Sequence, residues 1–300
     1  MKFHRRLDPF PPATQHLMHT PPTRRHFLQC TLAFAAAATP AAFAQQPTFT
    51  APKAGQKKGY AIGPLTPQWD RMVTELKAKW VYGWTAKRPA TVPEGIDWVP
   101  MIHRDAPNHP AAKALEEVQA QTNPKPSALL GFNEPDRKEQ ANMTVEQALA
   151  LWPKLEALNL PLGSPSGAQP DGEWMLSFMK QAAKLKYRID FVTVHWYGGA
   201  SSTQLLSVLD RIAKLYDRPI WLTEFCPADW TALKTGKNKN TEKDVLRFIQ
   251  DTLPKLERAS HVHRYSWFCT TPKNAALGTS SLFDNNGTLT PLGKAYAEEG

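Results

Sequence analysis

The sequence predicts an α/β fold, a single (β/α)8 TIM barrel, and three observations favour it. The chain has 300 residues, 42% of them hydrophobic and ten of them Trp, so it can fill one large core. Eight short apolar runs recur along it. Between most of them lie segments whose apolar residues are spaced three or four apart, which is the helical period. Such alternation predicts parallel strands joined by right-handed crossovers, and eight of them predict a closed barrel.

The apolar runs give the expected strands in chain order: 57–63, 79–85, 96–103, 127–134, 160–167, 188–197, 218–226 and 263–269. Helical periodicity predicts the following helices: 69–80, 110–121, 144–158, 174–185, 204–216 and 242–259. The pattern is weakest in the second strand–helix unit. The segment that follows its strand, 86–95, is rich in Pro and too short for a good helix.

The first 44 residues resemble an export signal. Arg24 and Arg25 precede an Ala-rich apolar run that closes on the small-x-small pattern ending at Ala44. This pattern is typical of a twin-arginine signal peptide that is cut after Ala44. The run is too short and too rich in Ala to span a bilayer, so a membrane anchor is the weaker interpretation. We therefore expect an exported protein, periplasmic or extracellular, with no stable membrane insertion.

The rest of the chain divides into a linker, 45–56, and one catalytic domain, 57–300. Met18 is an alternative to Met1 as the true start, because the signal needs nothing before it.

The chain carries a net charge of +9 at pH 7, and 1–44 accounts for +4 of it, which leaves a mildly basic domain of about +5.

Composition and motifs exclude several classes of function. No Lys or Arg cluster suggests a nucleic-acid partner, and the Lys-rich stretch 234–243 is better interpreted as a solvated loop. The sequence also contains no phosphate loop, dinucleotide fingerprint or G-x-S-x-G motif. Phosphoryl transfer, hydride transfer and serine-hydrolase chemistry therefore have no support.

Two glutamates end predicted strands, and catalytic groups of such barrels gather where strands end. Glu134 closes the fourth run and Glu224 the seventh, so their carboxyl groups should meet across the barrel mouth. Glycoside cleavage needs one carboxyl group to protonate the leaving oxygen and one carboxylate at the anomeric carbon. The alternative for each glutamate alone is a helix cap or an ion-pair partner.

Other polar residues at strand ends fit a sugar site. Asn133 is a candidate to bind a sugar hydroxyl, and the alternative is a turn-forming role. His195 and Tyr197 share one strand face, so we expect them to hydrogen-bond the nucleophile or the substrate. No metal is expected, because His103 and His195 lack carboxylate partners at ligand spacing and His261 and His263 precede the last strand.

Aromatic residues at or after strand ends can stack on glucose units. These candidates are Trp84, Trp196, Tyr197, Trp230 and Trp267, and the alternative for each of the Trp residues is core packing.

Five separated motifs carry a family resemblance: GFNEPD, VHWYGG, WLTEF followed by ADW, RYSWF, and the closing GTSSLFDNNGTLTPLGKAY. In this order they resemble glycoside hydrolase family 128, β-1,3-glucanases of fungi and bacteria, from the first strand to Tyr296. The resemblance implies a (β/α)8 barrel and a retaining mechanism, with Glu134 as acid/base and Glu224 as nucleophile. It also places Trp267 under the sugar being cleaved.

The implied protein is a monomer without a cofactor that binds β-glucan polysaccharide or oligosaccharide and cleaves β-1,3-glucan within the chain. Retaining chemistry places the two carboxyl groups ~5 Å apart. The pKa of Glu134 should be raised by the negative charge beside it. Two rival functions remain: a non-catalytic β-glucan-binding or sensing barrel, and a barrel glycosidase for another β-linked polysaccharide.

The cysteines depart from the family pattern. A small residue usually follows Thr-Glu-Phe in the family, whereas this chain has Cys226, with Cys269 at matching depth on the next strand. A disulfide and two inert buried thiols both fit these positions.

Overall fold

The structure is a computed structural model that describes residues 49–63 and 67–300. The described residues belong to one compact unit, 45–300. The predicted export signal, its cleavage site and part of the predicted linker lie outside the described residues. Among the helices that are described, none combines the length and the apolar character needed to span a bilayer.

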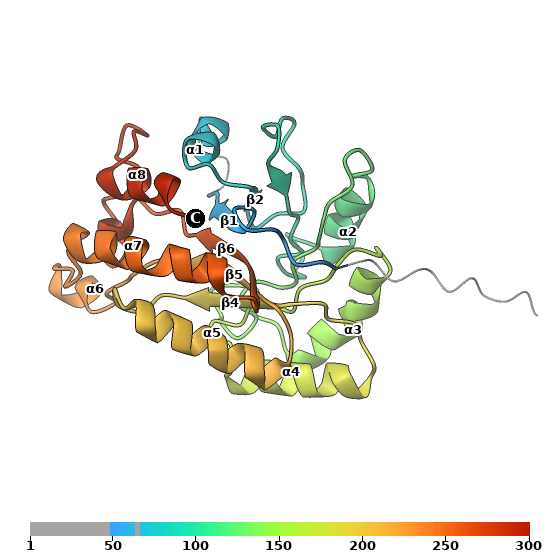
Figure 1. The fold of residues 1–300 in the computed structure, drawn as a ribbon. Coiled ribbons are helices and arrows are strands. Elements are labelled where there is room, and N and C mark those ends of the chain that lie inside the picture. The colour runs from blue at the N-terminus through green and yellow to red at the C-terminus, as the bar shows by residue number, and fades with distance from the viewer. Residues whose placement is uncertain (1–48, 64–66) are drawn as a thin grey trace, which may run out of the picture. The chain divides into compact units, whose positions relative to one another are not determined.

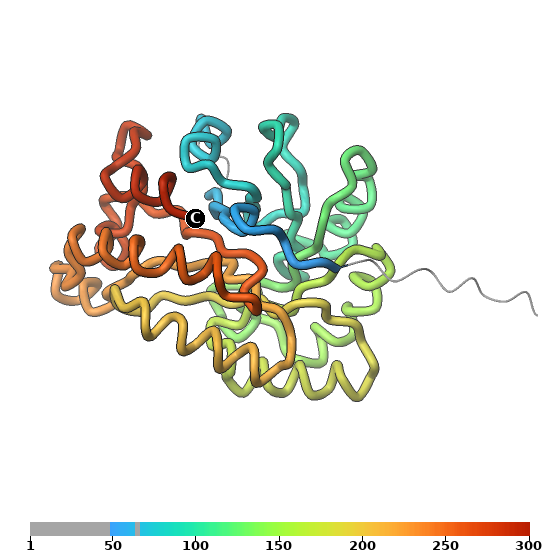
Figure 2. Tube along the Cα trace, viewed as in Figure 1, coloured from blue at the N-terminus to red at the C-terminus, as the bar shows by residue number. Residues whose placement is uncertain are grey.

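Six strands form one sheet in the order β3-β2-β1-β6-β5-β4, and every neighbouring pair is parallel. The strands are β1 (Lys58–Ala61), β2 (Trp80–Tyr82), β3 (Asp97–Trp98), β4 (Val192–Trp196), β5 (Ile220–Phe225) and β6 (Val262–Trp267). The first strand pairs with the last, as the blue and red-orange segments of Figure 2 show. Six of the eight predicted strands are therefore present as strands.

The other two predicted strands, 127–134 and 160–167, close the sheet into a barrel through isolated parallel bridges. These bridges join Met101 to Leu130, Leu129 to Leu162, Asn133 to Ser166, and Gly163 to Phe191. Pro161 and Pro165 lack the N–H that a regular ladder needs, which explains why the second segment pairs only at single positions. The prediction of an α/β barrel is thus confirmed, with two irregular members.

The described helices are α1 (Trp69–Glu75), α2 (Ala111–Gln119), α3 (Val145–Glu156), α4 (Glu173–Lys184), α5 (Ser202–Tyr216), α6 (Ala232–Thr235), α7 (Glu242–Arg258) and α8 (Pro291–Glu298), with a 3-10 turn η1 (Gly278–Ser280). Helices α5 and α7 pack side by side on the outside of β4, β5 and β6 (Figure 1). Capping boxes at Thr144 and Thr241 begin α3 and α7. The six predicted helices are present, and the sequence prediction missed α6 and α8.

Aromatic rings and one ion pair fill the N-terminal end of the barrel. Phe191 stacks on Trp221 with ring centroids 4.1 Å apart, and Phe49 stacks on Phe191 at 5.2 Å. Arg264 lies over Trp221 at 4.4 Å and pairs with Asp97 at 2.7 Å. Because Phe49 packs here, the segment expected to be only a linker also helps to close the barrel. The opposite end, where the strands finish, is left for the functional site.

Two consecutive lysines tie the first strand to the last two helices. Lys57 Nζ donates to the carbonyls of Leu256, Glu257 and Ala259 at the end of α7. Lys58 Nζ donates to those of Tyr296, Ala297 and Glu299 at the end of α8. Both lysines are buried. The last carbonyls of a helix have no partner within it and carry partial negative charge, so an ammonium group there stabilises the helix end.

Replacing Lys58 tests this tie. Lys58→Met keeps the length of the side chain but leaves the carbonyls at the end of α8 without their donor. We expect the free energy of unfolding in urea to fall by about 1–3 kcal/mol. The control Lys113→Met, on the exposed face of α2, should change it by less than about 0.5 kcal/mol. Equal effects of the two substitutions would show that the Lys58 contacts contribute nothing to stability.

Candidate active site

Glu134 lies in a strained turn at the end of segment 127–134, beside the end of segment 160–167. Its N–H donates to Ser166 O at 2.8 Å, and its φ of 41° lies in the left-handed region that favours glycine. The Asp136 carboxylate accepts from the N–H groups of Ala168 and Gln169 at 2.9 and 3.2 Å, which fixes the following loop beside the turn. Strain of this kind clusters at functional sites. The turn therefore holds the Glu134 side chain, which is 16% exposed, at the barrel mouth.

Glu224 lies one residue before the end of β5 and is held by three hydrogen-bond donors. Trp84 Nε1 donates to its Oε1 at 2.7 Å, and Tyr82 OH donates to the same oxygen at 3.0 Å. Tyr197 OH donates to its Oε2, which confirms the expected contact between this tyrosine and the second glutamate. Trp84 itself has a φ of 54°, a second left-handed residue at the site. The Glu224 carboxylate is thus buried, oriented and surrounded by donors.

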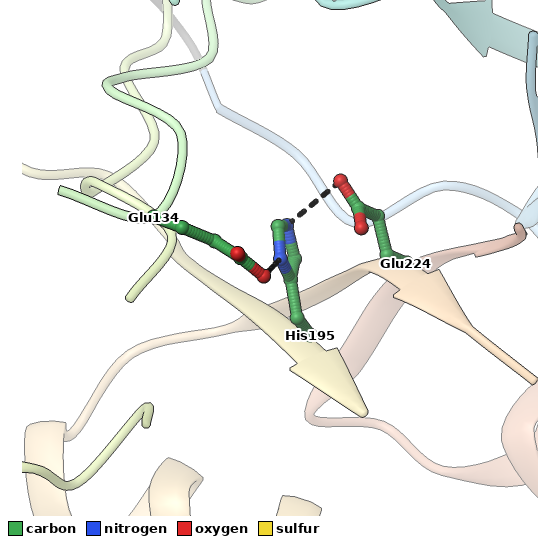
Figure 3. Close-up of side chains that lie close together, drawn as sticks. All are labelled: Glu134, His195 and Glu224. Atoms are coloured by element: carbon green, nitrogen blue, oxygen red, sulfur yellow. Dashed lines mark hydrogen bonds and ion pairs between the residues drawn. The ribbon is translucent and has the colours of Figure 1, made fainter. Parts of the chain in front are cut away.

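His195 lies between the two glutamates (Figure 3). Its Nδ1 is hydrogen-bonded to Glu134 Oε1 at 3.0 Å, whereas its Nε2 lies 3.3 Å from Glu224 Oε1 without forming a hydrogen bond. The imidazole side chain is only 1% exposed. Ligand-type atoms of the three residues, one from each, all lie within 4.8 Å of one another, so a carboxylate oxygen of Glu134 comes within that distance of one of Glu224.

The pKa values reflect this arrangement. Burial raises the pKa of Glu134, but the hydrogen bond and the charge of His195 outweigh burial, and the net pKa is lowered. The expectation of a raised pKa for Glu134 is therefore wrong in direction, because a histidine separates the two carboxylates. Burial lowers the pKa of His195, but the charges of Glu224 and Glu134 outweigh burial and raise it. The two glutamates thus raise the pKa of the imidazole that lies between them, and the imidazole lowers the pKa of Glu134.

A cleft of about 950 Å³ contains these groups. One wall is formed by Gly63, Trp84 and Phe268 from the first, second and last strand units. The other wall is formed by Arg137, Gln140 and the loop 168–171. Arg211 of α5 also lines the cleft and pairs with Asp171 there. The cleft therefore crosses the C-terminal face of the barrel and has the carboxylate pair within it.

Four of the predicted binding residues lie at the cleft beside His195. Asn133 is buried and donates to Gln140 Oε1 at 3.2 Å, and no described group donates to its Oδ1. Trp230 is 53% exposed, and its Nε1 donates to Tyr197 O at 3.2 Å. Tyr197 and Trp84 line the cleft, but each also donates to Glu224.

Of the other two predicted aromatics, Trp267 is a core residue, whereas Trp196 packs against the core and also borders the cleft. Trp267 is fully buried, packs on Phe225 at 5.0 Å and donates from Nε1 to Ser280 O, so it does not lie under a bound sugar. The Trp196 ring stacks on Phe248 of α7 at 5.6 Å, although the residue borders the cleft. Successive side chains of a strand point to opposite faces, which turns Trp267 outward towards the helices.

The sequence analysis missed two residues of the site, Phe268 and Tyr82. Phe268 lines the cleft and contacts the rings of Trp84 and Tyr197 at 5.7 and 5.3 Å. Tyr82 lies two residues before Trp84, and both side chains donate to Glu224. The two-residue strand period applied to Trp84 could have identified Tyr82 from sequence.

The described residues with ligand-type atoms close enough for a metal ion are Glu134, His195 and Glu224. Carboxylate and imidazole groups are ligands that Zn²⁺ accepts. Both nitrogens of His195 already face carboxylates, so a cation would have to replace a proton there. The prediction that His195 lacks carboxylate partners is wrong, because both partners come from other strands.

Cys226 and Cys269 are free thiols in the structure. Cys226 is buried, and Cys269 is partly buried and lines the cleft. Burial, assisted by the charge of Glu224, raises the pKa of Cys269 to about 12, so this thiol stays protonated. The sequence allowed either a disulfide or two thiols at these positions, and the structure contains two thiols.

Comparison with known proteins places this geometry among related barrels. The family model described as glycosyl hydrolase catalytic core matches residues 59–296. A solved structure of a subgroup I GH128 endo-β-1,3-glucanase from Amycolatopsis mediterranei, a variant in complex with laminarihexaose, is 33% identical with a TM-score of 0.70. The match covers 82% of this chain and 100% of that one.

Two other solved GH128 enzymes are similar. A subgroup II endo-β-1,3-glucanase from Sorangium cellulosum is 25% identical, with a TM-score of 0.66 and coverage of 81% of this chain and 98% of that one. A subgroup III curdlan-specific exo-β-1,3-glucanase from Blastomyces gilchristii, in complex with glucose, is 27% identical, with a TM-score of 0.61 and coverage of 82% and 99%.

A curated relative is also similar over part of its length. Alkali-sensitive linkage protein 1 of Schizosaccharomyces pombe is 31% identical over 180 residues, which are 57% of this chain. The match spans 32% of that protein, about a third of its length.

Proposed function

The chain belongs to the glycosyl hydrolase catalytic core family, and from this premise we propose that it is a retaining β-1,3-glucanase that cleaves within the glucan chain. The observation that carries the proposal is the carboxylate pair, in which one oxygen of Glu134 lies within 4.8 Å of one oxygen of Glu224. Retaining glycosidases have carboxyl groups about 5–5.5 Å apart, whereas inverting ones need about 6.5–9.5 Å to admit a water molecule. The short separation supports double displacement.

In this proposal Glu224 is the nucleophile and Glu134 the acid/base. Glu224 attacks the anomeric carbon while Glu134 protonates the departing glycosidic oxygen, which leaves a glycosyl ester on Glu224. Glu134 then removes a proton from the water that hydrolyses the ester. The donors Tyr82, Trp84 and Tyr197 hold the attacking carboxylate in one orientation, which saves the entropy of positioning it during the reaction.

Relatives support β-1,3-glucan as the substrate. Solved GH128 relatives were captured with laminarihexaose, and with laminaritriose and laminaribiose. The relatives of subgroups I and II are endo-acting, and the subgroup III relative is exo-acting. Internal cleavage is supported here by the higher identity to the subgroup I enzymes and by a cleft lined from both halves of the barrel.

An assay of new reducing ends on laminarin, curdlan, β-1,4-mannan and mixed-linkage glucan tests the proposal. Hydrolysis of the first two substrates supports it. Binding of laminarin without new reducing ends would favour a non-catalytic β-glucan-binding barrel. Hydrolysis of only the other two would indicate a glycosidase of different linkage. Early release of long oligosaccharides indicates internal cleavage, and early release of only one short product would contradict it.

Substitution of each glutamate separates the two roles. Glu134→Ala should lower kcat/KM on laminarin by about 10²–10⁴-fold, because proton donation to the leaving group is lost. It should spare the first step on a dinitrophenyl laminari-oligosaccharide, whose leaving group needs no proton. Glu224→Ala should abolish turnover of both substrates, because no ester can form. If Glu224→Ala kept activity on the aryl substrate and Glu134→Ala lost it, the assigned roles would be reversed.

Trp230 tests the sugar-binding wall of the cleft. Its exposed ring is fixed by the hydrogen bond to Tyr197 O, so it can stack on a glucose unit. We expect Trp230→Ala to raise KM for laminarihexaose about tenfold, equivalent to ~1.4 kcal/mol of lost contact, with little change in kcat. Leu233→Ala is the control, because Leu233 is 66% exposed on α6 but does not line the cleft. An unchanged KM for Trp230→Ala would remove this residue from the substrate site.

A further inference from the structure

Both ring nitrogens of His195 face carboxylate oxygens, Nδ1 towards Glu134 and Nε2 towards Glu224 (Figure 3). A neutral imidazole has one N–H donor and one acceptor, so one of the two contacts would bring an acceptor against an ionised carboxylate. Both contacts are attractive when the ring carries two protons, or when the facing carboxyl group holds one itself. The three groups therefore share one proton beyond a neutral imidazole with two carboxylates.

The shared proton matters because the proposed reaction needs a protonated Glu134. Glu134 must hold a proton when the glycosidic bond breaks, yet the lowered pKa of Glu134 favours its ionised form in the free protein. The proton must therefore be held nearby until it is needed. The hydrogen bond between His195 Nδ1 and Glu134 Oε1, 3.0 Å long, is the direct path to the acid.

We propose that His195 stores the proton that Glu134 delivers to the leaving group, and so acts through Glu134 rather than on the sugar. The inference rests on the proposed function and adds a source for the catalytic proton. In the resting site His195 is an imidazolium and both glutamates are carboxylates.

The proton passes from His195 to the leaving group and back in four steps. When substrate enters, the Nδ1–H bond of His195 breaks, an O–H bond forms on Glu134, and the imidazole becomes neutral with its remaining proton on Nε2, facing Glu224. Glu134 then gives its proton to the departing oxygen as Glu224 forms the ester. In the second half, Glu134 takes a proton from the attacking water as Glu224 is released as a carboxylate. That proton returns to His195 Nδ1, and the starting state is restored.

Among the groups around Glu134, His195 is the one suited to store the proton. The charged groups that act on it are Glu224 from β5 and Glu134 and Asp136 from the turn after 127–134. His103, on the next strand unit, has its pKa lowered to about 4 by burial and by Arg104 and His109, so it is neutral near pH 7.

The remaining groups at the site do not exchange protons near neutrality. Burial, with Glu224 nearby, raises the pKa of Tyr82 and of Tyr197 far above the usual range, and Cys269 is protonated as described above. Arg137 also lines the cleft, and its charge helps to lower the pKa of Glu134. Because the His195 side chain is only 1% exposed, its proton is also shielded from exchange with solvent, whereas Glu134 remains open to substrate.

The test compares the pH dependence of kcat/KM on laminarin for the wild type and His195→Gln. In the wild type, activity is lost at alkaline pH when His195 gives up its stored proton. In His195→Gln the proton must sit on Glu134 alone, so the alkaline limb should move to lower pH by at least about one unit. The loss of kcat/KM should therefore reach at least about tenfold on the alkaline limb, at about pH 8, and shrink towards about pH 5.

Tyr197→Phe is the matched control, because it removes a hydrogen bond to Glu224 but no group that titrates near neutrality. It should lower kcat/KM but leave the alkaline limb at its wild-type pH. A His195→Gln variant whose alkaline limb likewise stays in place would overturn the proposal and leave His195 with a structural role. Absence of laminarin hydrolysis by the wild type would instead overturn the proposed function, so the two failures are distinguishable.

A second measurement uses the unaltered protein, in case His195→Gln does not fold. Nitrogen-15 NMR of the histidine-labelled full chain, with the His195 signals assigned by comparison with Glu134→Gln, reports the protonation of both ring nitrogens. We expect both to be protonated at about pH 6–7, and the His195 pKa to fall in Glu134→Gln. A neutral His195 ring at about pH 6 in the unaltered protein would contradict the proposal.

Discussion

The site depends on one contact, an imidazole that lies between two carboxylates. Two buried carboxylates so close together repel each other, and the proposed imidazolium between them would offset that repulsion. Glu134, His195 and Glu224 come from three different parts of the chain, so the contact exists only because parallel strands end at one edge of a closed barrel. The closed barrel is therefore what brings the histidine between the two carboxylates.

The opposite end of the barrel shows why the chemistry is confined to the strand ends. There Phe49, Phe191 and Trp221 stack, and Arg264 with Asp97 fills the remaining polar positions. At the C-terminal face the turn of Glu134 and the left-handed Trp84 instead hold their side chains towards the cleft. Backbone strain at these two residues is tolerated because the surrounding hydrogen bonds determine their positions.

Much of the fold and the main site could be predicted from sequence, because their signals are local. Apolar runs alternating with helical periodicity identified the strands, and the glutamates follow from being the acids that close two of them. The closing motif around Tyr296 supported the family resemblance, but its helix, α8, was not predicted. Two signals were misleading. Trp267 and Phe268 are neighbours of similar character, and only the face that each occupies decides which one reaches the cleft. The pKa of Glu134 depends on His195, sixty-one residues away in sequence, so spacing alone cannot give its direction.

The central claim is that Glu224 attacks the sugar directly and that Glu134 serves in both halves of a double displacement. Proton NMR of laminarihexaose during the first minutes of hydrolysis tests it most directly, because the anomeric signal of the new reducing end reports the stereochemistry. A retaining reaction releases the β-anomer first, and the α-anomer then grows only through mutarotation. Initial release of the α-anomer would show that water attacks directly, and would contradict the role assigned to Glu224.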